Sequence, residues 1–143
     1  MARKTSAGLY IAALSVILAI IGIIAYLINT GTNYYAKMGV SSGVLICLIA
    51  AAVITVLHII LGLRGTSLAA DILPVCASVL LTVGFMLLLN ARVNNLAAVF
   101  TFENSAANMA DTTSCIVAIA FCLLAMIVSI VSAFFDITKA SKA

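Results

Sequence analysis

The sequence predicts an all-α membrane protein, a bundle of four transmembrane helices with both termini in the cytoplasm. Three observations predict it: an apolar composition, four long apolar segments, and an uneven distribution of Lys and Arg. Of 143 residues, 66% are hydrophobic and 8% are charged. Soluble domains carry roughly 25% charged and 45–50% apolar residues. A chain with so few charges is suited to lipid, and its length is typical of a single domain, residues 1–143.

Four apolar segments are long enough to cross a bilayer. We place the spans at about residues 8–28, 40–63, 68–89 and 115–135. As a helix, the first extends about 31 Å, which matches a hydrocarbon core about 30 Å thick. Arg3 and Lys4 precede it, but its apolar region is longer than that of a signal peptide, so we expect it to stay in the protein.

Turn and capping residues mark the other boundaries. The second span follows Gly39 and ends at Arg64, which is followed by a glycine. Pro74 lies in the first turns of the predicted third span, where we expect a proline to be tolerated. Residues 111–114 (DTTS) offer oxygen atoms that cap a helix, which predicts the start of the fourth span.

The segment from Asn90 to Thr113 joins the third and fourth spans. Within it, four apolar side chains recur at helical spacing: Val93, Leu96, Ala97 and Phe100. The spacing predicts either a short interfacial helix on the outer leaflet or an extension of the third span.

The positions of Lys and Arg predict the orientation. One side of the predicted bundle collects Arg3, Lys4, Arg64, Lys139 and Lys142, and the other collects Lys37 and Arg92. Cytoplasmic loops carry the excess of these residues. We therefore expect the termini and the Arg64 loop in the cytoplasm.

Small residues recur at alternating steps of three and four on the first and fourth spans. The first row is Gly8, Ala12, Ser15, Ala19 and Gly22, and the second is Cys115, Ala118, Cys122, Ala125, Ser129 and Ser132. This spacing keeps one face of a helix against a partner helix. Close backbone approach and hydrogen bonds between helices stabilise association in lipid. We predict that both rows are helix-packing seams, within one chain or between subunits.

His58 is the ionisable side chain placed well inside a predicted span, and it shares a helix face with Thr55. Ionisable residues in membranes are frequently functional. The alternatives are a proton-sensitive binding site with Asp71 nearby, or a neutral histidine hydrogen-bonded between helices. On the opposite side, Arg92 and Glu103 are candidates to bind a partner or to pair among the loop charges.

Several classes of chemistry are not indicated. The sequence contains no metalloprotease, phosphate-binding-loop or nucleophile-elbow motif. We therefore expect no enzyme, no cofactor and no metal site. The net charge of +3 forms no basic stripe, which argues against nucleic-acid binding. The four cysteines lie in apolar segments and are expected to be packing residues; the alternative is a bridge from Cys47 to Cys115 or Cys122.

Five short segments carry a resemblance to a group of proteins. They are Asn33-Tyr34-Tyr35, Ala91-Arg92-Val93-Asn94, Thr101-Phe102-Glu103-Asn104, Met109-Ala110-Asp111 and Phe134-Phe135-Asp136-Ile137. With them the chain resembles small four-span membrane proteins of anaerobic Gram-positive bacteria. The resemblance implies a multi-pass protein of the bacterial cytoplasmic membrane and no particular activity.

Two functional hypotheses remain. The first is a non-enzymatic accessory or scaffold subunit of a cell-envelope complex, which the packing seams and the compact outer segment favour. The alternative is a small homo-oligomeric channel or transporter for ions or small solutes, which His58 and the hydroxyl side chains within the spans favour. The expected partners are the lipid bilayer and either another membrane protein or a second copy of the chain.

Overall fold

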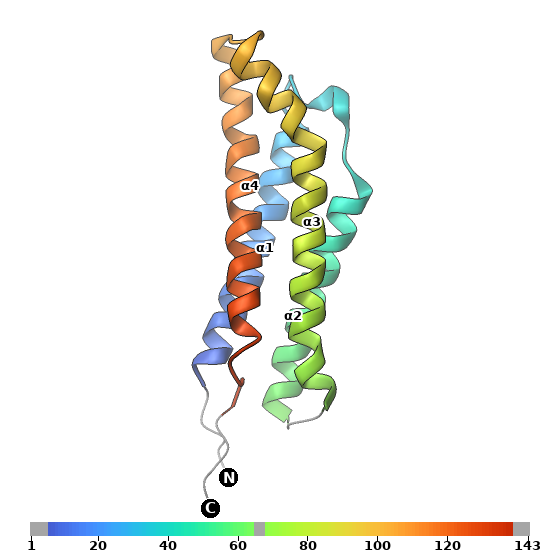
Figure 1. Ribbon diagram of the computed structural model, residues 1–143, viewed down its shortest axis with the longest axis vertical. Helices are drawn as coiled ribbons and strands as arrows, with labels where there is room; N and C mark the ends of the chain where they lie inside the picture. The colour runs from blue at the N-terminus through green and yellow to red at the C-terminus, as the bar shows by residue number, and fades with distance from the viewer. Residues whose placement is uncertain (1–5, 65–67, 139–143) are drawn as a thin grey trace, which may run out of the picture.

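The computed structural model describes residues 6–64 and 68–138, and the described chain is almost entirely helical (Figure 1). The elements are α1 (Ala7–Thr30), the one-turn 3₁₀ helix η1 (Ala36–Met38), α2 (Ser42–Arg64), α3 (Leu68–Thr101) and α4 (Ala106–Ser132). Each of the four α-helices is long and apolar enough to cross a membrane. The predicted fold class, an all-α bundle of four membrane-spanning helices, is confirmed.

The four helices run alternately up and down and form a closed ring of neighbours. α1 packs most extensively against α4, α2 packs against α3, and contacts of α3 with α4 and of α1 with α2 complete the ring. One end of the bundle carries η1 and the α3–α4 connection, and we call it the η1 end. The other carries the last turns of α2 and the first turns of α3, and we call it the His58 end.

The start of α1 and the segment that follows α4 lie together at the His58 end. The backbone N–H of Ser6 donates a 3.0 Å hydrogen bond to the carbonyl of Ile137. Four of the charges that predict a cytoplasmic position for this end lie outside the described residues: Arg3, Lys4, Lys139 and Lys142. The orientation of the bundle in the membrane therefore stays a prediction.

The rows of small residues lie buried between α1 and α4. On α1 the buried residues are Gly8, Ala12, Ser15, Ala19, Gly22, Tyr26 and Asn29. On α4 they are Thr112, Cys115, Ala118, Cys122, Ala125, Ser129 and Ser132. The Ser15 hydroxyl donates to the Ala125 carbonyl at 3.5 Å, so the two backbones lie close enough for a short side chain to bridge them. Close approach of this kind stabilises helix pairs in lipid.

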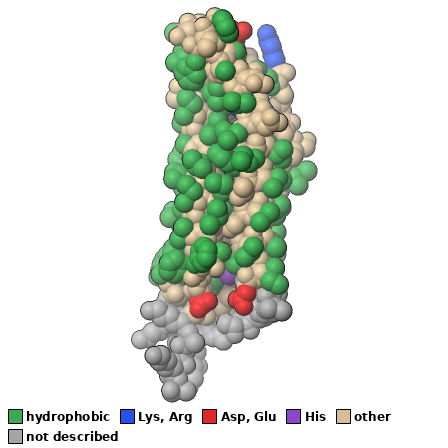
Figure 2. Space-filling model, viewed as in Figure 1, with side chains coloured by type: hydrophobic (Ala, Val, Ile, Leu, Met, Phe, Trp, Pro, Cys, Tyr) green, Lys and Arg blue, Asp and Glu red, His purple; other side chains and the backbone are tan. Residues whose placement is uncertain are grey.

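Larger side chains fill the space between the two helix pairs. Leu48 of α2, Leu81 and Leu88 of α3, and Tyr26 of α1 are all buried in one apolar cluster. Other large aliphatic side chains, such as Ile17, are exposed on the outside of the bundle. In the face shown in Figure 2, apolar side chains cover the walls and charged side chains gather at the two ends. This arrangement, with apolar walls and charged ends, is suited to a lipid bilayer.

The helices extend beyond the predicted spans at the η1 end. Residues 90–101 continue α3 instead of forming a separate helix, and at 34 residues α3 is about 51 Å long. The last turns of α3 therefore project past a hydrocarbon core of about 30 Å. α4 begins earlier than expected, because Ser105 rather than residues 111–114 caps it: its side chain accepts from the N–H of Asn108 at 3.1 Å.

At the His58 end, α4 ends at Ser132, before the predicted limit of residue 135. Hydrogen bonds from Phe134 to Val131 and from Phe135 to Ser132, both 3.1 Å, tighten the chain into a turn that satisfies the last carbonyls. Asp136 consequently lies on the segment that follows the helix. All four cysteines are free, so the alternative bridge from Cys47 is not formed. Cys115 and Cys122 are buried, whereas Cys76 is exposed and is not a packing residue.

Candidate functional site

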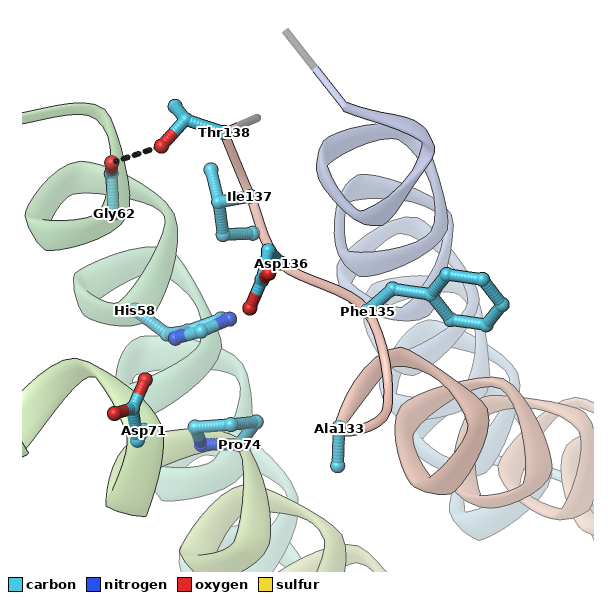
Figure 3. A pocket seen from close by; sticks show the side chains of 9 residues that line it. All are labelled: His58, Gly62, Asp71, Pro74, Ala133, Phe135, Asp136, Ile137 and Thr138. Carbon is cyan, nitrogen blue, oxygen red and sulfur yellow. Dashed lines mark hydrogen bonds between the residues drawn. The ribbon is translucent and has the colours of Figure 1, made fainter. Parts of the chain in front are cut away.

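A cavity of about 310 Å³ lies at the His58 end, where α2, α3 and the segment after α4 meet (Figure 3). Its lining residues are His58, Gly62, Asp71, Pro74, Ala133, Phe135, Asp136, Ile137 and Thr138. The cavity therefore brings together residues from three separate parts of the chain.

Gly62 allows the segment after α4 to close this cavity. A Cβ atom at position 62 would lie 2.7 Å from the Cβ of Ile137, so a larger residue would push Ile137 away. Because α2 has no side chain there, Ile137 is buried against it. The Thr138 hydroxyl also donates to the Gly62 carbonyl at 3.5 Å. These two contacts hold the segment after α4 over the cavity.

The cavity places two carboxylates beside His58. The His58 side chain is 6% exposed, and in Figure 3 the side chains of Asp71 and Asp136 point toward its ring while Phe135 points away. The cavity lining therefore combines an imidazole with two carboxylates, and these side chains can hydrogen-bond to a small polar molecule. No set of three or more His, Cys, Asp or Glu in residues 6–64 and 68–138 is arranged to hold a metal ion.

The sequence grouped His58 with Asp71 and Thr55, but the structure separates Thr55 from the cavity. Thr55 is buried, and its hydroxyl donates to the carbonyl of Ala51 on its own helix at 2.9 Å. Sequence reasoning missed Asp136, which directly follows the predicted fourth span. One signal was available in the sequence: Asp136 directly follows two phenylalanines at the end of an apolar segment. A charged side chain at that place is expected to lie outside the lipid.

Arg92 forms the centre of the opposite, η1 end. It is 1% exposed although it carries a charge. Its guanidinium lies 5.1 Å from the ring centroid of Tyr35 and 5.5 Å from that of Tyr26, distances at which a cation is attracted to an aromatic face. It also donates to the Gly39 carbonyl at 3.5 Å. Arg92 therefore anchors the α1–α2 connection to α3.

Glycine is required at one position of that connection. Gly39 has a φ of 66°, in the left-handed region that side chains other than glycine adopt at a cost. This conformation turns the chain from η1 into α2 and presents the Gly39 carbonyl to Arg92.

A second network joins the α1–α2 connection to α4. The N–H of Tyr34 donates to the Asp111 carboxylate at 2.9 Å, and the hydroxyls of Tyr35 and Thr112 are 3.3 Å apart. Hydrogen bonding to Glu103 raises the pKa of Tyr34 to about 12. Burial raises the pKa of Tyr35. Glu103 therefore lies close to Tyr34.

These contacts frame a larger cavity of about 520 Å³ at the η1 end. Its lining residues are Asn33, Tyr34, Lys37, Met38, Asn95, Ala98, Glu103 and Asn108. Among the residues proposed from sequence, Glu103 lines this cavity, while Arg92 lies buried beneath the connection that forms one of its walls. Lys37 and the three asparagines were not proposed as site residues, because nothing in their spacing groups them.

No family model, no curated protein and no solved structure matches the chain. The fold and its two polar ends define the class: a polytopic membrane protein with four α-helical spans.

Proposed function

We propose that this polytopic protein is a non-enzymatic accessory or scaffold subunit of a bacterial cell-envelope complex. One observation carries the proposal: its interior is filled by its own side chains, and its polar surfaces lie at the two ends. A protein built in this way presents fixed surfaces to partners on either side of a membrane. Residence in the bacterial cytoplasmic membrane is part of the same proposal.

The packing of the centre supports this function. Leu48, Leu81 and Leu88 are fully or almost fully buried there. The hydroxyls at that depth bond within the chain: Ser78 and Ser129 lie 3.0 Å apart. A solute crossing between the helices would have to displace these side chains. The structure thus favours a rigid element over a path through a single chain.

The alternative is a homo-oligomeric channel or transporter, which the cavity beside His58 favours. Ionisable side chains at a membrane boundary frequently belong to ion or solute paths, and His58, Asp71 and Asp136 line this cavity together. In an oligomer, such sites would surround a path between subunits and not within one.

Mild-detergent purification of the full chain, followed by mass measurement of the intact complex, tests the proposal. A reproducible co-purifying membrane protein that cross-links to the bundle supports the accessory function. A homo-oligomer whose ion flux in liposomes falls in His58→Ala, and not in the lipid-facing control Cys76→Ala, contradicts it and supports the channel. Cys76 is a suitable control because its side chain is exposed on α3.

A further inference from the structure

We propose that the 520 Å³ cavity at the η1 end binds the headgroup of a zwitterionic phospholipid, one that carries both a phosphate and an ammonium group. This inference does not depend on the accessory function, because a lipid site serves a scaffold and a channel equally well. It rests on the depth of the cavity in the membrane, the pair of charges on its walls, and the hydrogen-bonding groups between them.

The cavity lies at the depth of lipid headgroups. Asn95 and Ala98 stand on the part of α3 that projects beyond the length needed to cross the hydrocarbon core. Large apolar side chains near the same end, including Val40, Phe100 and Phe102, are exposed. Amphipathic and aromatic side chains typically occupy the membrane boundary. A lipid could therefore place its headgroup in the cavity while its acyl chains follow the apolar wall of the bundle.

The charges on the walls match a zwitterion. Lys37 comes from η1 and Glu103 from the α3–α4 connection, so an ammonium and a carboxylate line one cavity. A lysine ammonium binds phosphate. A carboxylate and an aromatic ring can both contact an ammonium group, and Glu103 and Tyr34 line this cavity together.

The overall charge of this end argues against an anionic lipid. Its charged residues in the described chain are Lys37, Arg92, Glu103 and Asp111, whose charges cancel. Arg92 is buried against two tyrosine rings and does not line the cavity. An anionic headgroup without an ammonium would leave the Glu103 carboxylate facing a second negative charge, whereas a zwitterion satisfies both walls.

Carboxamides supply the remaining hydrogen bonds. Asn95 and Asn108 each donate through Nδ2 to a backbone carbonyl, at 3.4 Å and 3.0 Å respectively, which fixes their orientation. Their Oδ1 atoms remain as acceptors, and Asn33 adds a further carboxamide. These groups are suited to the ammonium hydrogens and to the glycerol region between phosphate and acyl chains.

The test is native mass spectrometry of the full chain in detergent with phosphatidylethanolamine and phosphatidylglycerol of identical acyl chains. We expect the wild type to retain phosphatidylethanolamine preferentially. Lys37→Gln and Glu103→Gln should each weaken its binding roughly tenfold, since each removes one charge-assisted hydrogen bond. Both side chains are exposed, so folding should be unaffected, which circular dichroism checks. The matched control at the His58 end, Arg64→Gln, should retain the preference.

Equal retention of the two lipids by the wild type, or an unchanged preference in both cavity variants, would overturn the proposal. Competition with soluble glycerophosphoethanolamine separates the sources of the ligand. Displacement of the lipid by this compound shows recognition of the headgroup alone, and its failure shows that the acyl chains are also needed; both agree with the proposal. Displacement by glucosamine but not by glycerophosphoethanolamine would instead identify a sugar site and overturn it.

Discussion

A Cβ atom on Gly22 would lie 2.9 Å from the Sγ atom of Cys122, closer than two such atoms normally approach. Gly22 of α1 therefore faces Cys122 of α4 with no space between them. This contact lies near the middle of the α1–α4 interface, where both helices bury one row of small residues.

Gly22→Ala should destabilise the bundle by about 1–3 kcal/mol, because the new methyl group overpacks against Cys122. The measurement is thermal unfolding in detergent. The double variant Gly22→Ala/Cys122→Ala should recover part of this loss, since it removes the Sγ atom. Equal melting temperatures for Gly22→Ala and the wild type would mean that α1 and α4 lie farther apart than described.

Ala125→Leu tests the same interface from α4. Ala125 is fully buried, whereas Ala120 on the same helix is exposed. The buried substitution should cost about 1–3 kcal/mol through overpacking, and Ala120→Leu should leave the melting temperature nearly unchanged because its side chain enters lipid. Ala19→Leu on α1 should behave like Ala125→Leu, since Ala19 is 1% exposed. Similar melting temperatures for Ala125→Leu and Ala120→Leu would contradict the assigned faces.

Arg92→Lys should lower the stability by about 1–2 kcal/mol, although it keeps the charge. A compact ammonium cannot lie against the rings of Tyr26 and Tyr35 and also reach the Gly39 carbonyl as the planar guanidinium does. The exposed Arg64 provides the matched control, and Arg64→Lys should have no effect. Thermal unfolding of both variants in one detergent makes the comparison.

Tyr34 should ionise at an unusually high pH. Glu103 is the main cause that raises its pKa from 10.0 to about 12, because a neighbouring carboxylate disfavours the phenolate. Since the folded-state pKa is the higher one, the associated stability is present below pH 10 and is lost as the pH rises toward 12. Ultraviolet titration of tyrosine ionisation should show this transition move toward 10 in Glu103→Gln and disappear in Tyr34→Phe. An unchanged titration in Glu103→Gln would exclude Glu103 as the cause.

The orientation predicts which end of the bundle a membrane-impermeant thiol reagent reaches in intact cells. Asn104 at the η1 end and Arg64 at the opposite end are both exposed, so each is suited to replacement by cysteine. We expect labelling of Asn104→Cys and none of Arg64→Cys until the cells are opened. The reverse pattern would place the termini outside and contradict the distribution of Lys and Arg.

The sequence by itself determined the class, the number of helices and the faces rich in small residues. A helix that crosses the lipid needs a minimum apolar length, and close backbone approach at regular spacing stabilises helix pairs in lipid. Both requirements produce a pattern that can be recognised within a short stretch of sequence, such as the row from Gly8 to Gly22. The ends of the helices were harder to predict from the sequence, because α3 and α4 continue through polar residues 90–101 and 106–114. A helix needs no apolar residues once it leaves the hydrocarbon core.

Only the tertiary structure decided which polar residues meet. Asp136 reaches the cavity of His58 because the chain turns back after Ser132 and packs on Gly62, and Arg92 is buried because the α1–α2 connection folds over it. Periodicity gives the face of a helix on which a side chain lies, but not the helix or loop opposite that face. That choice depends on the volumes of side chains distant in sequence and on a few hydrogen bonds in the connections, and both of these become defined when the bundle is assembled.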